Sequence, residues 1–181
     1  IILYELSEYS LFQIERECLA IIDSKDLDTA IIPILGDIRD QKNLDFIFKK
    51  FQVDHIYHAA AYKHVPIVED ENNLSIAAEN NILGTYNLAQ AAVENSIHSF
   101  VMISTDKAVR PTNVMGATKR FAEIIIQSIN SSTDVTRFSM VRFGNVINSS
   151  GSVIPLFLDQ ISQGGPVTVT DKNVMRYFMT I

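Results

Sequence analysis

The four residues at 104–107 place two hydroxyls, a carboxylate and an amine side by side, as Ser104, Thr105, Asp106 and Lys107. Such a cluster can bind a substrate hydroxyl, give a proton and take one. A second amine, Lys119, lies four residues after Met115, which puts both on one face of a helix. The alternative for 104–106 is turn chemistry and a helix cap, because short polar side chains also stabilise turns.

These residues need a strand and a helix to hold them. An apolar run at 100–103 has strand length, and a helix is predicted from 114 to about 130, after the loop 110–113. The same alternation recurs, with strands predicted at 1–4, 30–35, 55–58 and 139–143 and helices at 8–22, 40–50, 66–95 and 153–163. This order predicts an α/β fold with a Rossmann-like, doubly wound parallel sheet.

The predicted helices carry further expectations. Ser7 can cap the first helix, whose inward face should comprise Leu11, Ile14, Cys18, Leu19 and Ile22. The stretch 66–95 is predicted to be a long helical region, opened by Pro66 and interrupted at Gly84, which suggests close packing or a bend there. Residues 167–169 are predicted to be a short extended segment.

Open parallel sheets bind ligands at the carboxyl ends of their strands. Glu5 could accept hydrogen bonds from both hydroxyls of an adenosine ribose and would repel a 2′-phosphate, which favours NAD over NADP. Its alternative is a carboxylate near a helix N-terminus. Asp37, after Gly36, could meet an adenine edge or be an ordinary turn residue. The alanines at 59–61 leave room for a flat ligand, or for tight helix packing.

Two arginines are candidates for a diphosphate, because a guanidinium offers phosphate oxygens a forked pair of donors. Arg176 follows the glycine- and serine-rich stretch 149–152 and is the better candidate. Arg142 lies inside an apolar strand, where a structural ion pair is the alternative.

Composition sets further bounds. The 181 residues suffice for one domain with a substantial core, and 47% are hydrophobic and 20% charged. The net charge of −6 argues against nucleic acid and anionic membranes as partners. Cys18 is the single cysteine, so no intrachain disulfide forms, and no apolar run is long enough to span a bilayer. His55, His58 and His64 lack a recognisable ligand spacing, so no metal is predicted.

Seven stretches together resemble one family. They read HAAAYKHVP at 58–66, NNILGT at 80–85, STDK at 104–107, NVMGATK at 113–119, RFGNV at 142–146, GSVIP at 151–155 and TDKNVMR at 170–176. The chain resembles an extended short-chain dehydrogenase/reductase and, more closely, the bacterial UDP-N-acetylglucosamine 4,6-dehydratases of polysaccharide biosynthesis. The resemblance covers nearly the whole chain, and the combination is specific although each motif alone is weak.

The resemblance implies tightly held NAD and a UDP-N-acetylhexosamine substrate that becomes a 4-keto-6-deoxy sugar. Lys107 would remove the C5 proton, Asp106 would protonate the departing C6 hydroxyl, and Thr105 would hydrogen-bond the C4 oxygen. The implied cofactor site comprises Glu5, Asp37, Ile38, Ala59, Ala60, Ala61, Lys63, Ser104 and Lys119. The implied UDP-sugar site comprises Lys63, Thr105, Asn145, Val153, Pro155, Leu156 and Arg176.

Three departures from the family pattern matter. Met115 stands where the superfamily has a catalytic tyrosine, as in the long, membrane-anchored members, which leaves Thr105, Asp106 or a water as base for the C4 hydroxyl. No G-x-G-x-x-G loop is present, and the strand before it would precede residue 1. Most of the substrate lobe would follow residue 181.

These departures lead us to expect an internal piece of a longer protein. Residues 1–145 would be a partial NAD-binding domain, and 146–181 would begin the UDP-sugar-binding region. We expect this piece to be cytoplasmic, within a membrane-anchored parent protein that forms a homodimer by analogy with the superfamily.

Other functions remain open at this stage. A UDP-sugar 4-epimerase shares the fold and cofactor but needs no base at C5, so Asp106 and Lys107 favour elimination. A C5-epimerising dehydratase would need the same residues. A non-catalytic nucleotide-binding module would be compatible with Met115 and the absent glycine loop.

Overall fold

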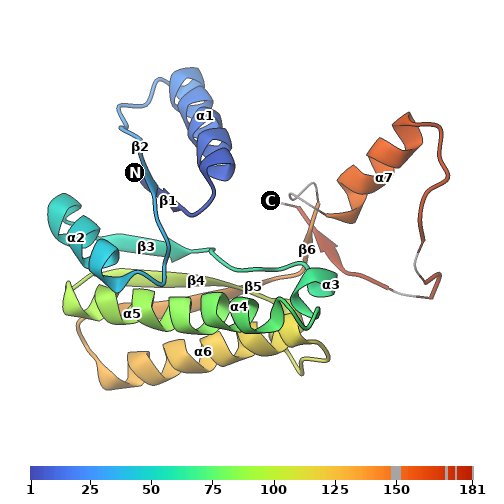
Figure 1. Ribbon diagram of the computed structural model, residues 1–181. Helices are drawn as coiled ribbons and strands as arrows, with labels where there is room; N and C mark the ends of the chain where they lie inside the picture. Colours follow the sequence, from blue (N-terminus) through green and yellow to red (C-terminus); the bar gives the residue numbers. More distant parts are fainter. Residues whose placement is uncertain (148–151, 170, 174, 181) are drawn as a thin grey trace.

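A computed structural model of the chain describes residues 1–147, 152–169, 171–173 and 175–180 (Figure 1). The strands are β1 (Ile2–Glu5), β2 (Ile32–Leu35), β3 (His55–His58), β4 (Ser99–Thr105), β5 (Arg137–Phe143), β6 (Asn145–Val146) and β7 (Phe178–Met179). The α-helices are α1 (Glu8–Lys25), α2 (Gln41–Phe51), α3 (Val65–Val68), α4 (Leu74–Ala78), α5 (Thr85–Glu94), α6 (Val114–Ser132) and α7 (Val153–Ser162). A π-helical segment, η1 (Glu79–Gly84), and a 3₁₀ turn, η2 (Asp106–Ala108), complete the set.

All the strand pairs are parallel, and in the described part of the chain they form three sheets. β3, β4 and β5 make the central sheet, β1 pairs with β2, and β6 pairs with β7. Helices α4, α5 and α6 cover one face of the central sheet (Figure 1). The Rossmann-like α/β class is thereby confirmed. β1 and β3 share no hydrogen-bonded pairing among the described residues, at the place where the expected fold has one more strand.

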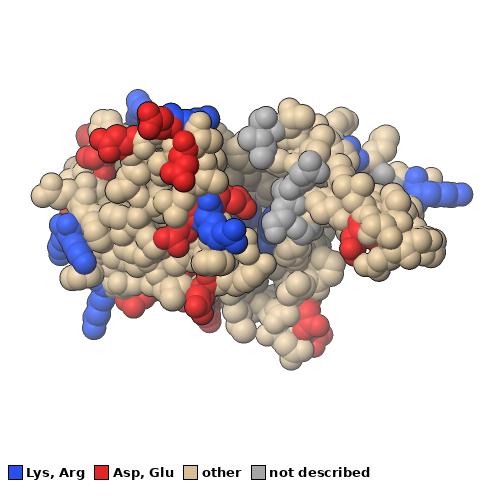
Figure 2. All heavy atoms as spheres, turned by 90° about the horizontal axis from the view of Figure 1, so that it is seen from above, with Lys and Arg blue, Asp and Glu red and all other residues tan. Residues whose placement is uncertain are grey.

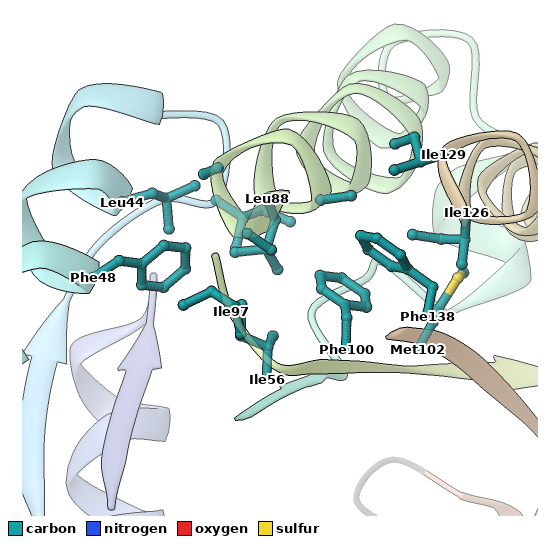
Figure 3. Close-up of a cluster of buried hydrophobic side chains, with 14 of the residues drawn as sticks. Leu44, Phe48, Ile56, Leu88, Ile97, Phe100, Met102, Ile126, Ile129 and Phe138 are labelled. Atoms are coloured by element: carbon teal, nitrogen blue, oxygen red, sulfur yellow. The ribbon is translucent and has the colours of Figure 1, made fainter. Parts of the chain in front are cut away.

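The core lies between the central sheet and its helices (Figure 3). Phe100 and Met102 of β4 are fully buried, because alternate residues of a strand point to the same face. They belong to one cluster with Leu88 of α5 and Ile126 of α6. The same period of two puts Ser104 on the helix-covered face and Thr105 on the other.

The predicted helical region over 66–95 is broken at 69–73, but α4, η1 and α5 run on without a gap from 74 to 94. The close packing expected at Gly84 is confirmed, since a Cβ there would lie 2.7 Å from Ile38 Cδ1. A turn separates α3 from α4, in which Asp70 Oδ1 accepts the backbone N–H of Asn72 at 2.9 Å. The Asn73 amide donates to the carbonyl of Ile67 at 3.1 Å. Short polar side chains that bond the local backbone compete with helical pairing, which explains the break.

The inward face predicted for α1 is wrong in part, although Cys18 and Ile22 are half-buried. Ser7 does cap the helix, since its hydroxyl accepts the Ser10 N–H at 3.3 Å. Leu11 is buried, but Ile14 and Leu19 are 40% and 45% exposed. α1 packs on the narrow β1–β2 pair, which leaves part of its apolar surface uncovered.

Two boundaries near the site differ from expectation. β4 continues to Thr105, so Ser104 and Thr105 are the last residues of the strand instead of the first of a loop. The segment 167–169 forms no strand, whereas β7 pairs with β6, a pairing that was not predicted. β7 therefore brings the chain's last described residues beside Asn145, which bonds the carbonyl of Tyr177 at 3.1 Å.

On the face seen from above, acidic and basic side chains are interspersed among uncharged ones (Figure 2). In the described ranges, no helix has the length and apolar character needed to cross a membrane.

Candidate functional site

Two adjoining cavities lie at the carboxyl ends of the strands. The first has a volume of about 180 Å³ and is lined by Tyr4, Glu5, Leu6, Gly36, Asp37, Ile38, Ala59, Ala60, Ala61, Tyr62 and Asn80. The second has a volume of about 850 Å³ and is lined by residues from the ends of β4 and β5, from α6 and α7, and from 168–178. Ala59, Ala61 and Tyr62 line both, so one elongated ligand could occupy the two together.

Tyr4 and Gly36 shape the first cavity. A Cβ on Gly36 would overlap the Tyr4 ring, so this packing requires glycine. The Tyr4 hydroxyl donates to the carbonyl of Asp37 at 3.0 Å and accepts from Asn43 Nδ2 at 3.1 Å. Burial raises the pKa of Tyr4, which keeps it a neutral donor. The backbone of Asp37 and Ile38 is thereby fixed beside the small side chains at 59–61.

The two acidic residues of the first cavity are engaged differently. Glu5 Oε1 accepts the Ser7 N–H at 2.9 Å, so the carboxylate lies near the N-terminus of α1, as its alternative role predicted. The same side chain still lines the first cavity. Asp37 accepts hydrogen bonds from Arg39, at 2.6 Å to Nη2 and 2.9 Å to Nε. These bonds lower the pKa of Asp37. Its carboxylate therefore stabilises the turn after β2, in agreement with the prediction that Asp37 is an ordinary turn residue.

The second cavity holds the hydroxyl, carboxylate and amine together. Thr105 Oγ1 donates to Asp106 Oδ1 at 3.0 Å and accepts the Lys107 N–H at 3.3 Å, which caps η2. Lys107 Nζ lies 3.1 Å from Asp106 Oδ1 and 3.0 Å from Asn145 Oδ1. Thr105, Lys107 and Asn145 line the cavity, and Asp106 lies beside it, bonded to the first two. The turn after β4 thus presents a hydroxyl, a carboxylate and an amine in one hydrogen-bonded chain.

Helix α6 supplies the cavity's opposite wall. Asn113 caps it, accepting the Gly116 N–H at 2.8 Å, and this start places Met115 and Lys119 one turn apart on the cavity. Met115 is 4% exposed and belongs to a cluster with Val68. Burial lowers the pKa of Lys119 to about 8 although Glu123 works against it. Lys119 can therefore change charge near neutral pH.

Sequence reasoning missed three residues near the cavities. Glu123 is fully buried and accepts the Ser104 hydroxyl at 2.7 Å and Arg142 Nη2 at 2.7 Å. Asn81 bonds both the N–H and the carbonyl of Tyr62, at 2.8 and 3.0 Å, and so holds the 59–62 segment. His58 is buried, and its Nε2 lies 2.8 Å from Thr85 Oγ1. The signal for Glu123 was an acidic residue on the apolar face of a helix.

The remaining predicted residues fall into three groups. Lys63, Val153, Leu156 and Arg176 line the second cavity, whereas Pro155 is half-buried and is not among the lining residues. Arg176 Nη1 donates to the carbonyl of Met175. Arg142 forms an ion pair with Glu123, which is the alternative predicted for it, and not a diphosphate site. The glycine and serines of the loop at 149–151 and Thr170 lie outside the described residues. In the described ranges, no group of three or more metal-ligating side chains could hold a metal ion.

A profile of the family described as "Polysaccharide biosynthesis protein" matches residues 1–181. The capsular polysaccharide biosynthesis protein CapD of Staphylococcus aureus is 50% identical over 183 residues, which cover 100% of this chain and 29% of CapD. A UDP-glucose 4-epimerase of Rickettsia canadensis is 40% identical over 149 residues, which cover 81% of this chain and 42% of the epimerase. The chain thus spans less than half the length of either relative.

Solved structures share the fold. The X-ray structure of Pen from Bacillus thuringiensis superposes with a TM-score of 0.86 at 37% identity, covering 99% of this chain and 53% of Pen. DesIV of Streptomyces venezuelae, a dTDP-glucose 4,6-dehydratase crystallised with NAD and DAU bound, gives a TM-score of 0.77 at 24% identity. It covers 91% of this chain and 54% of DesIV.

Proposed function

The chain belongs to the polysaccharide biosynthesis protein family, and from this premise we propose that it carries the reacting groups of a UDP-N-acetylglucosamine 4,6-dehydratase. The observation that carries the proposal is the Asp106–Lys107 pair, 3.1 Å apart at the edge of the larger cavity. Eliminating water across C5 and C6 needs one group to take the C5 proton and another to protonate the leaving hydroxyl. A 4-epimerase needs no such pair.

The adenosine end of NAD would occupy the first cavity. The small side chains at 59–61 would leave space for a flat ring, and Glu5, which lines the same cavity, would accept ribose hydroxyls. Lys119 places an amine on the wall of the second cavity. When bound, NAD supplies a reversible hydride acceptor. The implied residues Asp37, Ile38, Lys63 and Ser104 would contact it through backbone or side chain.

Thr105 and Asp106 form the route for the C4 hydroxyl proton, since Met115 can neither take nor give one. Thr105 takes that proton and passes its own along the 3.0 Å bond to Asp106. Asp106 then gives a proton to the C6 hydroxyl, which leaves as water. Lys107 removes the C5 proton and later returns one to C5. Each proton taken from the sugar is thus accounted for in water or the product.

The UDP-sugar would lie in the second cavity, against Lys63, Thr105, Asn145, Val153, Leu156 and Arg176, with Pro155 behind them. We propose residues 1–145 as the cofactor part and 146–181 as the start of the sugar-binding part. A homodimer and a cytoplasmic location within a membrane-anchored protein complete the proposal. A relative 43% identical over 179 residues, MJ1061 of Methanocaldococcus jannaschii, is described as an uncharacterized membrane protein.

A UDP-sugar 4-epimerase is the second candidate, favoured by the Rickettsia relative. The mass of the product separates the two. The natural full-length protein is incubated with UDP-N-acetylglucosamine and NAD⁺, and the nucleotide sugar is analysed by mass spectrometry. Dehydration removes the mass of one water, whereas epimerisation leaves the mass unchanged and would refute the proposal. NMR at C5 then tells a C5-epimerising dehydratase from a retaining one.

A further inference from the structure

Glu123 joins the three segments that carry the reacting groups. Its Oε1 accepts the Ser104 hydroxyl at 2.7 Å and Arg142 Nε at 2.8 Å, and its Oε2 accepts Arg142 Nη2 at 2.7 Å and Arg120 Nη1 at 2.9 Å. The carboxylate is 0% exposed, and both its oxygens are fully engaged. One side chain of α6 therefore holds the ends of β4 and β5.

Each of these bonds ends next to a reacting group. Ser104 is followed directly by Thr105, Asp106 and Lys107. Arg142 is three residues before Asn145, which bonds Lys107 Nζ at 3.0 Å. Glu123 itself lies one turn beyond Lys119 on α6. A shift of any one segment would separate the acid, the base and the cavity wall.

We propose that Glu123 is a positioning residue that sets the placement of the Thr105–Lys107 turn against α6. This inference rests on the proposed function. A buried carboxylate with several charged donors is costly to disturb, because removing its charge leaves the arginines without their partner. Its geometry is also directional: the forked guanidinium of Arg142 fixes the angle between β5 and α6.

The charges around Lys119 make the role measurable. The titratable or charged groups near it are Glu123 on α6, His58 on β3, and the cavity-lining side chains Lys63, His64, Lys107, Asp171, Lys172 and Arg176. Burial acts to raise the pKa of Glu123, but bonds from Arg142, Ser104 and Arg120 outweigh it and lower the pKa to about 2. Glu123 therefore stays negative at working pH and favours the charged form of Lys119.

The test compares Glu123→Gln with Ile126→Val in the natural full-length protein. Ile126 is 1% exposed and lies on the same helix outside this network, so its variant controls for a general loss of stability. For Glu123→Gln we expect kcat to fall about 10- to 100-fold with KM for the UDP-sugar within threefold. The alkaline limb of the pH–rate profile should move down by about one pH unit. Ile126→Val should leave both unchanged.

A second variant and a binding measurement also test the positioning role of Glu123. If Glu123→Gln does not fold, Arg142→Lys replaces it, which keeps a positive charge but loses the fork, and kcat should again fall. If the wild-type protein converts no UDP-sugar, the proposed function fails, and positioning is tested by the pH dependence of NAD⁺ affinity. As the pH rises, this affinity should begin to fall at a lower pH in Glu123→Gln than in wild type. A kcat within twofold of wild type, or a pH profile unchanged, overturns the inference.

Discussion

The backbone carbonyl of Lys107 lies against the Cα of Gly116, so closely that a Cβ there would overlap it. The turn after β4 and the first turn of α6 thus come into contact backbone to backbone. Asn113 Oδ1, which caps α6, would lie 3.2 Å from the same Cβ. This contact sets the distance between the Asp106–Lys107 pair and the wall that carries Met115 and Lys119.

Gly116→Ala should therefore separate the two walls of the second cavity. Because a backbone carbonyl cannot move aside as a flexible side chain can, we expect a loss of about 1–3 kcal/mol of unfolding free energy. Activity should fall at least tenfold, as measured by product formation. Ala117→Ser, at the exposed neighbouring position, should change neither quantity. Full activity in Gly116→Ala would show that the close contact is dispensable.

Lys107→Ala and Asp106→Asn should each reduce kcat for dehydration by about 10²–10⁴-fold, since each removes one proton transfer. Initial rates with UDP-N-acetylglucosamine measure the effect. Lys42→Ala on the exposed surface of α2 serves as the control for loss of a lysine. Normal function in Lys107→Ala would favour the non-catalytic nucleotide-binding alternative.

Glu5→Ala should raise the affinity for NADP⁺ about tenfold, because the carboxylate that repels a 2′-phosphate is gone. Calorimetric titration with NAD⁺ and NADP⁺ gives both affinities. Glu8→Gln removes a nearby carboxylate from the exposed start of α1 and should leave the NADP⁺ affinity unchanged. An unchanged NADP⁺ affinity in Glu5→Ala would place the ribose elsewhere.

His58 should make the fold acid-sensitive. Burial, and then the charge of Lys119, lower the pKa of His58 from 6.5 to about 3. Between pH 6.5 and about pH 3 the unfolded chain therefore binds a proton that the folded chain does not bind. The contribution of neutral His58 to the free energy of unfolding is fully present above pH 6.5 and is lost as the pH falls toward 3. The slope contributed by this residue is about 1.4 kcal/mol per pH unit.

Thermal unfolding between pH 5 and 7 measures that slope, a range above the ordinary pKa of Glu123. His58→Gln, which can still bond Thr85, should lower it, whereas His98→Gln at an exposed position should not. Equal slopes in wild type and His58→Gln would mean that the buried histidine titrates normally.

The sequence predicted most of the strand and helix order, because the spacing of apolar residues follows the buried face of each strand or helix. It also placed Thr105, Asp106, Lys107 and Asn145 at one edge, since parallel strands share a carboxyl end. It could not predict the pairing of β6 with β7 or the break at 70–73, which depend on contacts distant along the chain and on local side-chain bonds.

Partner choice was the other limit. Arg142 was ambiguous between a diphosphate and an ion pair, and only the fold brings it to Glu123, nineteen residues away. Asp37 was similarly open until Arg39 was seen to engage its carboxylate. The sequence shows which residues are charged, but the partner that neutralises each of them is determined by the packed structure.

The most direct test of the account uses UDP-N-acetylglucosamine carrying deuterium at C4. A 4,6-dehydratase takes the C4 hydrogen as a hydride and returns it to C6, so NMR of the product should show the deuterium in a new C6 methyl group. Deuterium that remains at C4 of an inverted sugar would identify an epimerase, and an unreacted sugar would identify a binding module. Either result would contradict the proposed elimination.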